Sequence, residues 1–278
     1  MIVLTSNNAT TSYVRSSPRP LGLVPTMGAL HEGHLALVRR ARRENTSVAA
    51  SIFVNPTQFG PQEDLATYPR DMDRDLALLE SEGVDLVYAP APEEVYPPGF
   101  DTWVDPGAMG QRLEGAVRPG HFRGVATVVT KLLSVIKPER AYFGQKDGQQ
   151  LAVIRQLERD LNLGVEIVAV PTVRDSDGLA LSSRNAYLTP EQRRAAPVIY
   201  RALTRARQLW DEGERDAAVL RAAAHGLLKA EPLLKEIDYV SIADADTLEE
   251  LSRIEGPAVV STAARLGGTR LIDNVLLG

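Results

Sequence analysis

Short apolar runs alternate with helical patterns over the first 170 residues. The runs that predict strands are continuously apolar, and they cover residues 21–25, 48–54, 86–89, 140–144 and 166–170. Between them, helical spacing of apolar residues predicts helices over residues 34–44, 70–82, 124–135 and 149–161. Continuous strands that alternate with helices are typical of a parallel sheet covered on both faces. We therefore predict an α/β fold with a doubly wound, Rossmann-like parallel sheet.

The pattern changes after Val173. Helical patterns rich in Ala, Leu and Arg cover residues 190–212 and 216–229, and strand patterns follow over residues 237–243 and 258–266. This order predicts a smaller α+β unit, and Pro171 lies between the two patterns. We predict a first domain over residues 1–172 and a second over residues 173–278.

Composition narrows the function classes. The 278 residues include 36 acidic and 31 basic side chains, a net charge of −5 that argues against broad nucleic-acid binding. The absence of cysteine excludes disulfides and thiolate metal sites. The sequence has no signal-peptide pattern and no apolar run of membrane-spanning length, so we expect no membrane partner and, by elimination, cytoplasmic residence.

Polar residues follow three of the predicted strands, where open α/β sheets bind ligands. After the first strand, Gly28 permits a close turn, and His31 and His34 lie three apart at the start of a helix. A helix N-terminus with two imidazole donors suits a phosphate. A helix cap with two surface histidines is an equal alternative at this point. A zinc site is weaker, because the metalloprotease spacing has one more residue between the histidines.

The next two segments are less specific by themselves. Asn55 and Gln58 could bind hydroxyl and carboxylate groups, although Asn-Pro is also a common turn opening. Lys146 suits phosphate oxygens, and Asp147 could accept from a hydroxyl or help to hold a metal. The alternative for this last segment is a solvated loop.

A fourth segment lies just beyond the predicted domain boundary. Ser182, Ser183 and Arg184 make a plausible phosphate clamp, and the alternative is a turn with a helix cap. Ser182 lacks the surroundings of a hydrolase nucleophile. The sequence also has neither the P-loop nor the dinucleotide-binding glycine fingerprint, so a phosphate site must be built without them.

Six segments together resemble one family. The motifs at residues 24–34, 53–59, 63–70, 118–125, 143–147 and 181–185 occur in this order in the pantothenate synthetases. That family belongs to the nucleotidyltransferase superfamily, which is related to class I aminoacyl-tRNA synthetases. The resemblance runs from about Leu21 to the C-terminus.

The resemblance implies an AMP-forming ligase. Such an enzyme joins pantoate to β-alanine through a pantoyl-adenylate, with ATP as substrate and Mg²⁺ as cofactor, and releases AMP and pyrophosphate. The resemblance also implies a homodimer. The alternatives are another nucleotidyltransferase of the superfamily, a non-catalytic nucleotide-binding protein, and a ligase that releases ADP through an acyl-phosphate.

The resemblance also implies roles for individual residues. His34, the expected proton donor, His31, Lys146 and Arg184 would be catalytic, and Gln58 and Gln150 would bind pantoate. The implied ATP contacts are Met27, Gly28, Ala29, Leu30, His31, Glu32, Gly33, His34, Gly144, Gln145, Lys146, Asp147, the backbone of Val173, Leu181, Ser182, Ser183 and Arg184. No metal ligands are assigned. A loop closure hinged near Val173 is a further expectation.

Two departures from the family pattern stand out. Gly148 replaces a residue that is usually aromatic in the family, which could loosen the loop behind Lys146 because glycine adds backbone freedom. The segment before Leu21 is short and rich in Ser and Pro, where family members carry a full first helix. We therefore expect altered packing or oligomer contacts at the N-terminus.

Overall fold

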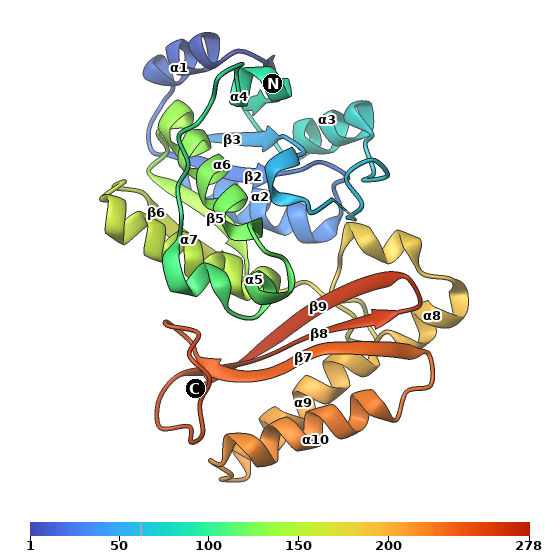
Figure 1. The fold of residues 1–278 in the computed structure, drawn as a ribbon. Helices are drawn as coiled ribbons and strands as arrows, with labels where there is room; N and C mark the ends of the chain where they lie inside the picture. Colours follow the sequence, from blue (N-terminus) through green and yellow to red (C-terminus); the bar gives the residue numbers. More distant parts are fainter. Residues whose placement is uncertain (62) are drawn as a thin grey trace. The chain divides into compact units, whose positions relative to one another are not determined.

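Figure 1 shows the computed structural model, which describes residues 1–61 and 63–278. The chain forms two compact units. Unit 1 comprises residues 1–111, 118–144 and 153–171, and unit 2 comprises residues 112–117, 145–152 and 172–278. Unit 2 thus combines the chain after Pro171 with two short earlier segments. The division into domains at residues 172/173 stays a prediction.

The sheet of unit 1 is parallel throughout the part of the chain described. Its strand order is β1-β4-β3-β2-β5-β6. The strands are β1 (Ile2–Leu4), β2 (Leu21–Thr26), β3 (Ser47–Ile52), β4 (Leu86–Tyr88), β5 (Arg140–Gly144) and β6 (Glu166–Val170). The chain runs outward from β2 through β3 and β4, and then resumes on the other side at β5. This reversal makes the carboxyl ends of β2 and β5 a topological switch point, the usual ligand site of such sheets.

Helices cover both faces of this sheet, as the continuous apolar strands predict (Figure 1). They are α1 (Asn7–Ser16), α2 (Glu32–Glu44), α3 (Met72–Ser81), α4 (Pro92–Val95), α6 (His121–Ile136) and α7 (Gly148–Leu161), the last of which contributes its first residues to unit 2. Two 3₁₀ turns, η1 (Pro56–Gln58) and η2 (Gly107–Gln111), complete the unit. One core cluster packs α2 and α3 against the sheet through Val24, Leu37, Val38, Ala50, Leu79 and Val87.

The first 20 residues form both a strand and a ten-residue helix, so the implied lack of a first helix is wrong, while altered packing or oligomer contacts there stay a prediction. β1 extends the sheet by pairing with β4, and the ten-residue α1 begins at an N-cap, Ser6, whose side chain accepts from the N–H of Ala9. Only Thr10 and Val14 of α1 are buried. This contact face is too narrow to give a hydrophobic period, which explains why the sequence did not predict the helix.

Unit 2 is built on a three-stranded antiparallel sheet in the described residues, ordered β7-β8-β9. Its strands are β7 (Leu234–Asp244), β8 (Ala258–Leu266) and β9 (Thr269–Leu277), and its helices are α5 (Glu114–Val117), α8 (Pro190–Ala195), α9 (Val198–Asp211) and α10 (Ala217–Lys229), with 3₁₀ turns η3 (Gln145–Asp147) and η4 (Ser183–Tyr187). The predicted helix over residues 190–212 is divided between α8 and α9 at Pro197. β9 was not predicted, since Asp273 and Asn274 interrupt its apolar pattern although both are buried. Figure 1 shows α9 and α10 along one face of this sheet, where their apolar side chains form its core.

None of the described helices is both long and apolar enough to span a bilayer.

Candidate active site

The turn that follows β2 is fixed by a carboxylate. Gly28 and Ala29 both adopt left-handed conformations, with φ of 82° and 50°. An alanine in this region costs about 1–3 kcal/mol unless its surroundings hold it there. The buried Asp75 of α3 provides that hold, since its carboxylate accepts from the N–H groups of Ala29 and Leu30 at 2.8 Å each. A Cβ added at Gly28 would lie 2.9 Å from Asp75 Oδ2, so the turn requires glycine.

The two histidines cap α2. His31 is the N-cap, and its Nδ1 accepts from the N–H of Gly33 at 3.1 Å, while His34 Nδ1 accepts from the N–H of His31 at 3.4 Å. Their ring centroids are 4.1 Å apart. Because both Nδ1 atoms accept, a neutral ring at either position carries its proton on Nε2. The helix N-terminus and two imidazole donors thus occupy one place, which is an arrangement suited to an anion.

Asn55 organises the segment after β3. It is 1% exposed, and its Oδ1 accepts from the hydroxyl of Tyr96 at 2.8 Å. Its Nδ2 donates to Gln58 Oε1 at 3.0 Å and to the carbonyl of Gly124 at 3.2 Å. The other end of the Gln58 amide contacts Met27 Sδ, with Nε2 at 3.3 Å. The Gln58 side chain is therefore oriented at both ends.

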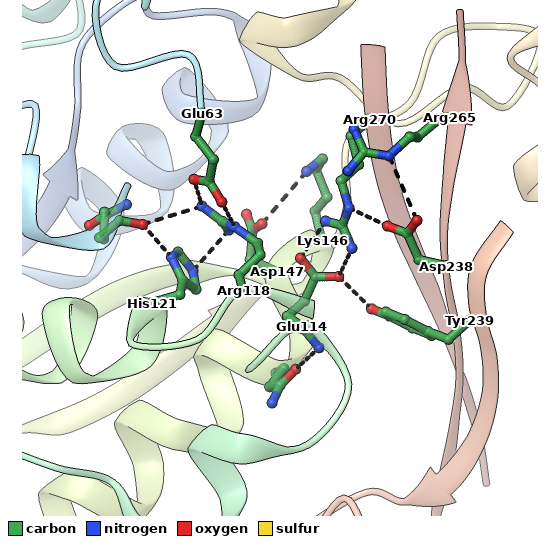
Figure 2. Close-up of polar contacts among 12 residues, drawn as sticks. Glu63, Glu114, Arg118, His121, Lys146, Asp147, Asp238, Tyr239, Arg265 and Arg270 are labelled. Atoms are coloured by element: carbon green, nitrogen blue, oxygen red, sulfur yellow. Dashed lines mark hydrogen bonds and ion pairs between the residues drawn. The ribbon is translucent and has the colours of Figure 1, made fainter. Parts of the chain in front are cut away.

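The main chain of Gln58 is held from α6 and the segment before it. The carbonyl of Gln58 accepts from His121 Nδ1 at 2.8 Å and from Arg118 Nη2 at 3.3 Å. Figure 2 shows Arg118 between His121 and Glu63, whose carboxylate it contacts at 2.7 and 2.6 Å. Burial works to raise the pKa of Glu63, but the hydrogen bonds and charge of Arg118 outweigh it and lower that pKa.

A close approach of η1 to α6 depends on Gly124. A Cβ added there would lie 2.5 Å from the carbonyl oxygen of Thr57 and 2.8 Å from the nitrogen of Gln58. Both atoms belong to the backbone, so neither can move aside cheaply. The position of Gln58 therefore requires a glycine on the facing helix.

In unit 2, Lys146 lies on η3 and is 3.6 Å from the carboxylate of Asp147. The buried Asn274 of β9 holds this turn: its Nδ2 donates to the carbonyls of Gln145 and Lys146, each at 2.9 Å. Its Oδ1 accepts from Gln145 Nε2 at 3.3 Å. The predicted loosening at Gly148 stays a prediction, but its surroundings are filled, because an added Cβ would lie 3.0 Å from Asn274 Nδ2.

The segment that leads to Ser182 is a short hairpin. Leu181 donates its N–H to the carbonyl of Val173 at 3.0 Å, and Arg174 pairs with Ala180. Ser182 caps η4, since its hydroxyl accepts from the N–H of Arg184 at 3.3 Å. The structure thus shows the capped turn that was the alternative, and the phosphate clamp stays a prediction.

Arg174 ties this hairpin to β9. Its Nη1 and Nη2 donate to the two carboxylate oxygens of Asp273 at 2.5 and 2.9 Å. Burial raises the pKa of Asp273, and the guanidinium of Arg174 works against that rise. The guanidinium also lies 3.9 Å from the ring centroid of Tyr200. A charged pair, buried on the aspartate side, thus fixes the base of the hairpin.

Segment 112–117 joins the same sheet through a second buried network. Arg270 Nη1 and Nη2 contact the Glu114 carboxylate at 2.6 and 2.7 Å, and Arg270 Nε contacts Asp238 (Figure 2). The Tyr239 hydroxyl donates to Glu114 Oε1 at 2.8 Å. Burial raises the pKa of Tyr239 well above its usual value, so the phenol keeps its proton.

The sequence-predicted residues fall in both units. Unit 1 brings together Met27, Gly28, Ala29, Leu30, His31, Gly33, His34 and Gln58, and Gly144 ends β5. Glu32 also lies there, but its carboxylate pairs with Arg39 of the same helix. Unit 2 contains Gln145, Lys146, Asp147, Gln150, Val173, Leu181, Ser182, Ser183 and Arg184. Their roles toward ligands stay predictions.

Sequence reasoning missed the residues that hold these segments in place. Asp75 and Asn274 are buried polar residues inside α3 and β9, where they lower the periodicity without pointing to a partner, and Tyr96 follows the end of α4. A buried polar residue in a strand is a signal only when it is read as needing a hydrogen-bond partner. Asp273 and Asn274, adjacent in an otherwise strand-like run, give such a signal.

The donor set offers Mg²⁺ no ready cage. Within residues 1–61 and 63–278, no three His, Asp or Glu side chains are grouped as metal ligands. Mg²⁺ is commonly held by substrate phosphates with few protein carboxylates. Asp147 is the acidic side chain next to Lys146, and its help in holding a metal stays a prediction.

Comparisons with known proteins agree with one another. A family model described as pantoate–β-alanine ligase matches residues 3–276. The chain is 63% identical to the pantothenate synthetase of Chloroflexus aurantiacus and 61% identical to that of Roseiflexus castenholzii, with 92% of each chain covered. The crystal structure of pantothenate synthetase from Thermus thermophilus is 51% identical, has a TM-score of 0.93 and covers 99% of both chains. A ligase from Francisella tularensis, complexed with β,γ-ATP and β-alanine, is 35% identical with a TM-score of 0.80, over 99% of this chain and 97% of that one.

Proposed function

The chain belongs to the pantoate–β-alanine ligase family, and from that premise we propose that it joins pantoate to β-alanine with ATP as the energy source. The first step forms pantoyl-adenylate and releases pyrophosphate. The second step transfers the pantoyl group to the amine of β-alanine and releases AMP.

One observation supports this proposal most strongly. The His31–His34 pair caps α2 at the carboxyl end of β2, and Gln58 is held beside Met27 in the same turn region. An anion site therefore adjoins an amide suited to a hydroxy acid. A hydroxy acid with a carboxylate nucleophile and a nucleotide with an electrophilic phosphorus match these two groups of residues.

The adenylation step needs positioning and charge stabilisation more than covalent chemistry. The pantoate carboxylate attacks the α-phosphorus in line, and pyrophosphate leaves with the bonding electron pair. We assign pantoate binding to Gln58 and Gln150. His31 and His34 donate to phosphate oxygens through Nε2, while Lys146 and Arg184 stabilise the charge that develops on them.

The sequence reveals no strong general base for the second step. The β-alanine amine attacks the pantoyl carbonyl carbon, AMP leaves with the electron pair of the acyl–oxygen bond, and the proton that the amine loses goes to the departing phosphate. Proximity, together with exclusion of water from the reactive adenylate, supplies the advantage.

Two features of the resemblance enter as proposals. Mg²⁺, bound through the phosphates of ATP, would neutralise part of their charge. A homodimer is the proposed assembly, and light scattering coupled to size-exclusion chromatography measures it directly.

The test is exchange of labelled pyrophosphate into ATP, with pantoate present and β-alanine omitted. We expect exchange that depends on pantoate, because the adenylation step is reversible. ADP release would instead indicate an acyl-phosphate route. ATP binding with neither pyrophosphate exchange nor ADP release would identify a non-catalytic nucleotide-binding protein and contradict the proposal.

A further inference from the structure

The turn that carries Lys146 owes its hydrogen bonding to a strand distant in the sequence. Both ends of the Asn274 amide, which projects from β9, form hydrogen bonds to η3. Nδ2 donates to the carbonyls of Gln145 and Lys146, and Oδ1 accepts from the side chain of Gln145. Only 5% of Asn274 is exposed, so water does not readily replace these bonds. The amide therefore fixes the peptide units on both sides of the Lys146 Cα atom.

Asn274 is itself fixed in place. Its N–H donates to Asp273 Oδ1 at 2.8 Å, and its carbonyl accepts from Arg174 Nη2 at 3.3 Å. Asp273 and Asn274 lie inside the β8–β9 ladder, where Asn274 is opposite Ser261 and Asp273 is opposite Thr262. The amide thus projects from a rigid strand rather than from a loop.

Asp273, the residue next to Asn274 in β9, contacts the hairpin that leads to the second candidate phosphate-binding segment. Arg174, held by Asp273, begins the hairpin that leads to Ser182 and Arg184, and it also donates to the carbonyl of Gly178 at 3.2 Å. Adjacent residues of β9 therefore hold η3 and the hairpin base at once.

We propose that Asn274 is a positioning residue for Lys146. It acts by setting the backbone of η3, from which the long and flexible lysine side chain extends. This inference rests on the proposed function, because it assigns Lys146 to the phosphates of ATP. A misplacement of about 1 Å at such a site can lower a rate by about 10²-fold.

The central experiment is a double-mutant cycle on pantoate-dependent pyrophosphate exchange. Asn274→Ala is expected to lower the exchange rate by roughly 10- to 100-fold. In a Lys146→Ala background, the same substitution should change the rate by less than about threefold, because residues that act through one another are not additive. An equal loss in both backgrounds would overturn the inference.

Thr262→Val is the matched control. Its hydroxyl is fully buried in the neighbouring strand and donates to the carbonyl of Tyr239 at 2.7 Å, so Thr262→Val also removes a buried side-chain bond to the backbone of unit 2, but away from η3. We expect a fall in thermal stability with less than about threefold loss of exchange. A loss equal to that of Asn274→Ala would show a general effect of weakening the sheet and would overturn the inference.

A second readout is independent of activity. Amide hydrogen exchange of residues 145–150, measured without ATP, should accelerate in Asn274→Ala and stay unchanged in Thr262→Val. Unchanged protection in both variants would contradict the proposed hold on η3. If the alanine variant does not fold, Asn274→Ser, whose shorter side chain supplies a hydroxyl donor in place of the amide, replaces it in both assays. Failure of the wild-type protein to exchange pyrophosphate would count against the proposed function alone.

Discussion

The two units place their functional residues by different physical means. In unit 1 the parallel sheet brings strand ends together. A helix cap at His31, an amide contact between Asn55 and Gln58, and the carboxylate of the distant Asp75 complete the arrangement. In unit 2 side chains of the antiparallel strand β9, among them Asn274 and Arg270, contact segments from elsewhere in the chain.

Each unit should therefore be sensitive to a different kind of substitution. Sheet topology locates the unit 1 residues even when one side chain is lost, so steric room should matter most there. The unit 2 segments depend on individual buried polar and charged partners, whose loss leaves another group unpaired. Substitutions should therefore separate the units by the kind of change that damages them.

The largest expected effect is on the stability of unit 2. Arg270→Met leaves the Glu114 and Asp238 carboxylates without their shared partner, and breaking a buried ion pair costs about 3–5 kcal/mol. Chemical denaturation measures the change. Arg193→Met is the control, since its partners Asp175 and Asp177 are exposed, and it should cost less than about 1 kcal/mol. Equal losses would remove the distinction between buried and exposed networks.

The next effect is catalytic. Lys146→Ala should lower pantoate-dependent pyrophosphate exchange by roughly 10²–10³, the usual loss for one donor that stabilises developing charge. Lys229→Ala, at the end of α10, should leave the rate within about twofold. A near-wild-type rate for Lys146→Ala would remove that lysine from the mechanism.

Steric room in unit 1 comes third. Gly124→Ala forces a Cβ to within 2.8 Å of the Thr57 and Gln58 backbones, so we expect a loss of about 1–3 kcal/mol and a raised KM for pantoate. The helical Gly226 of α10 has nothing within 4 Å of an added Cβ, and Gly226→Ala should instead stabilise by roughly 0.5–1 kcal/mol. An unchanged KM in Gly124→Ala would separate Gln58 from pantoate binding.

The smallest effect is the acid sensitivity of the Arg118–Glu63 pair. The folded pKa of Glu63 is lowered, so the pair contributes stability above the unfolded carboxyl pKa and loses it as pH falls through the folded value. From pH 5 to pH 3, the wild-type protein should lose more unfolding free energy than Glu63→Gln, by up to about 1 kcal/mol. Equal acid sensitivity of the wild-type protein and Glu63→Gln would show that the pair contributes nothing to stability. Dependence on individual charged partners would then be limited to unit 2.

Much of the unit 1 sheet was predictable because β2, β3 and β4 are buried on both faces, and the sequence of each central strand is a short apolar run. β2, β5 and β6 lie where the sequence placed them, within one residue at each end. The first helix was not predictable in this way, since α1 buries only Thr10 and Val14 and is stabilised mainly by its cap and its neighbours.

The fold class, the family motifs and the candidate ligand-binding residues were all predictable from the sequence. These depend on local patterns: apolar runs, turn glycines and residue types at fixed spacing. The distant side chains that hold those residues became apparent in the folded chain alone. Asp75 closes the turn at Ala29, Gly124 makes room for Gln58, and Asn274 fixes the turn of Lys146. Hydrogen-bond partners and steric room depend on which segments lie close together in space. A local sequence pattern contains no information on the distance between remote segments.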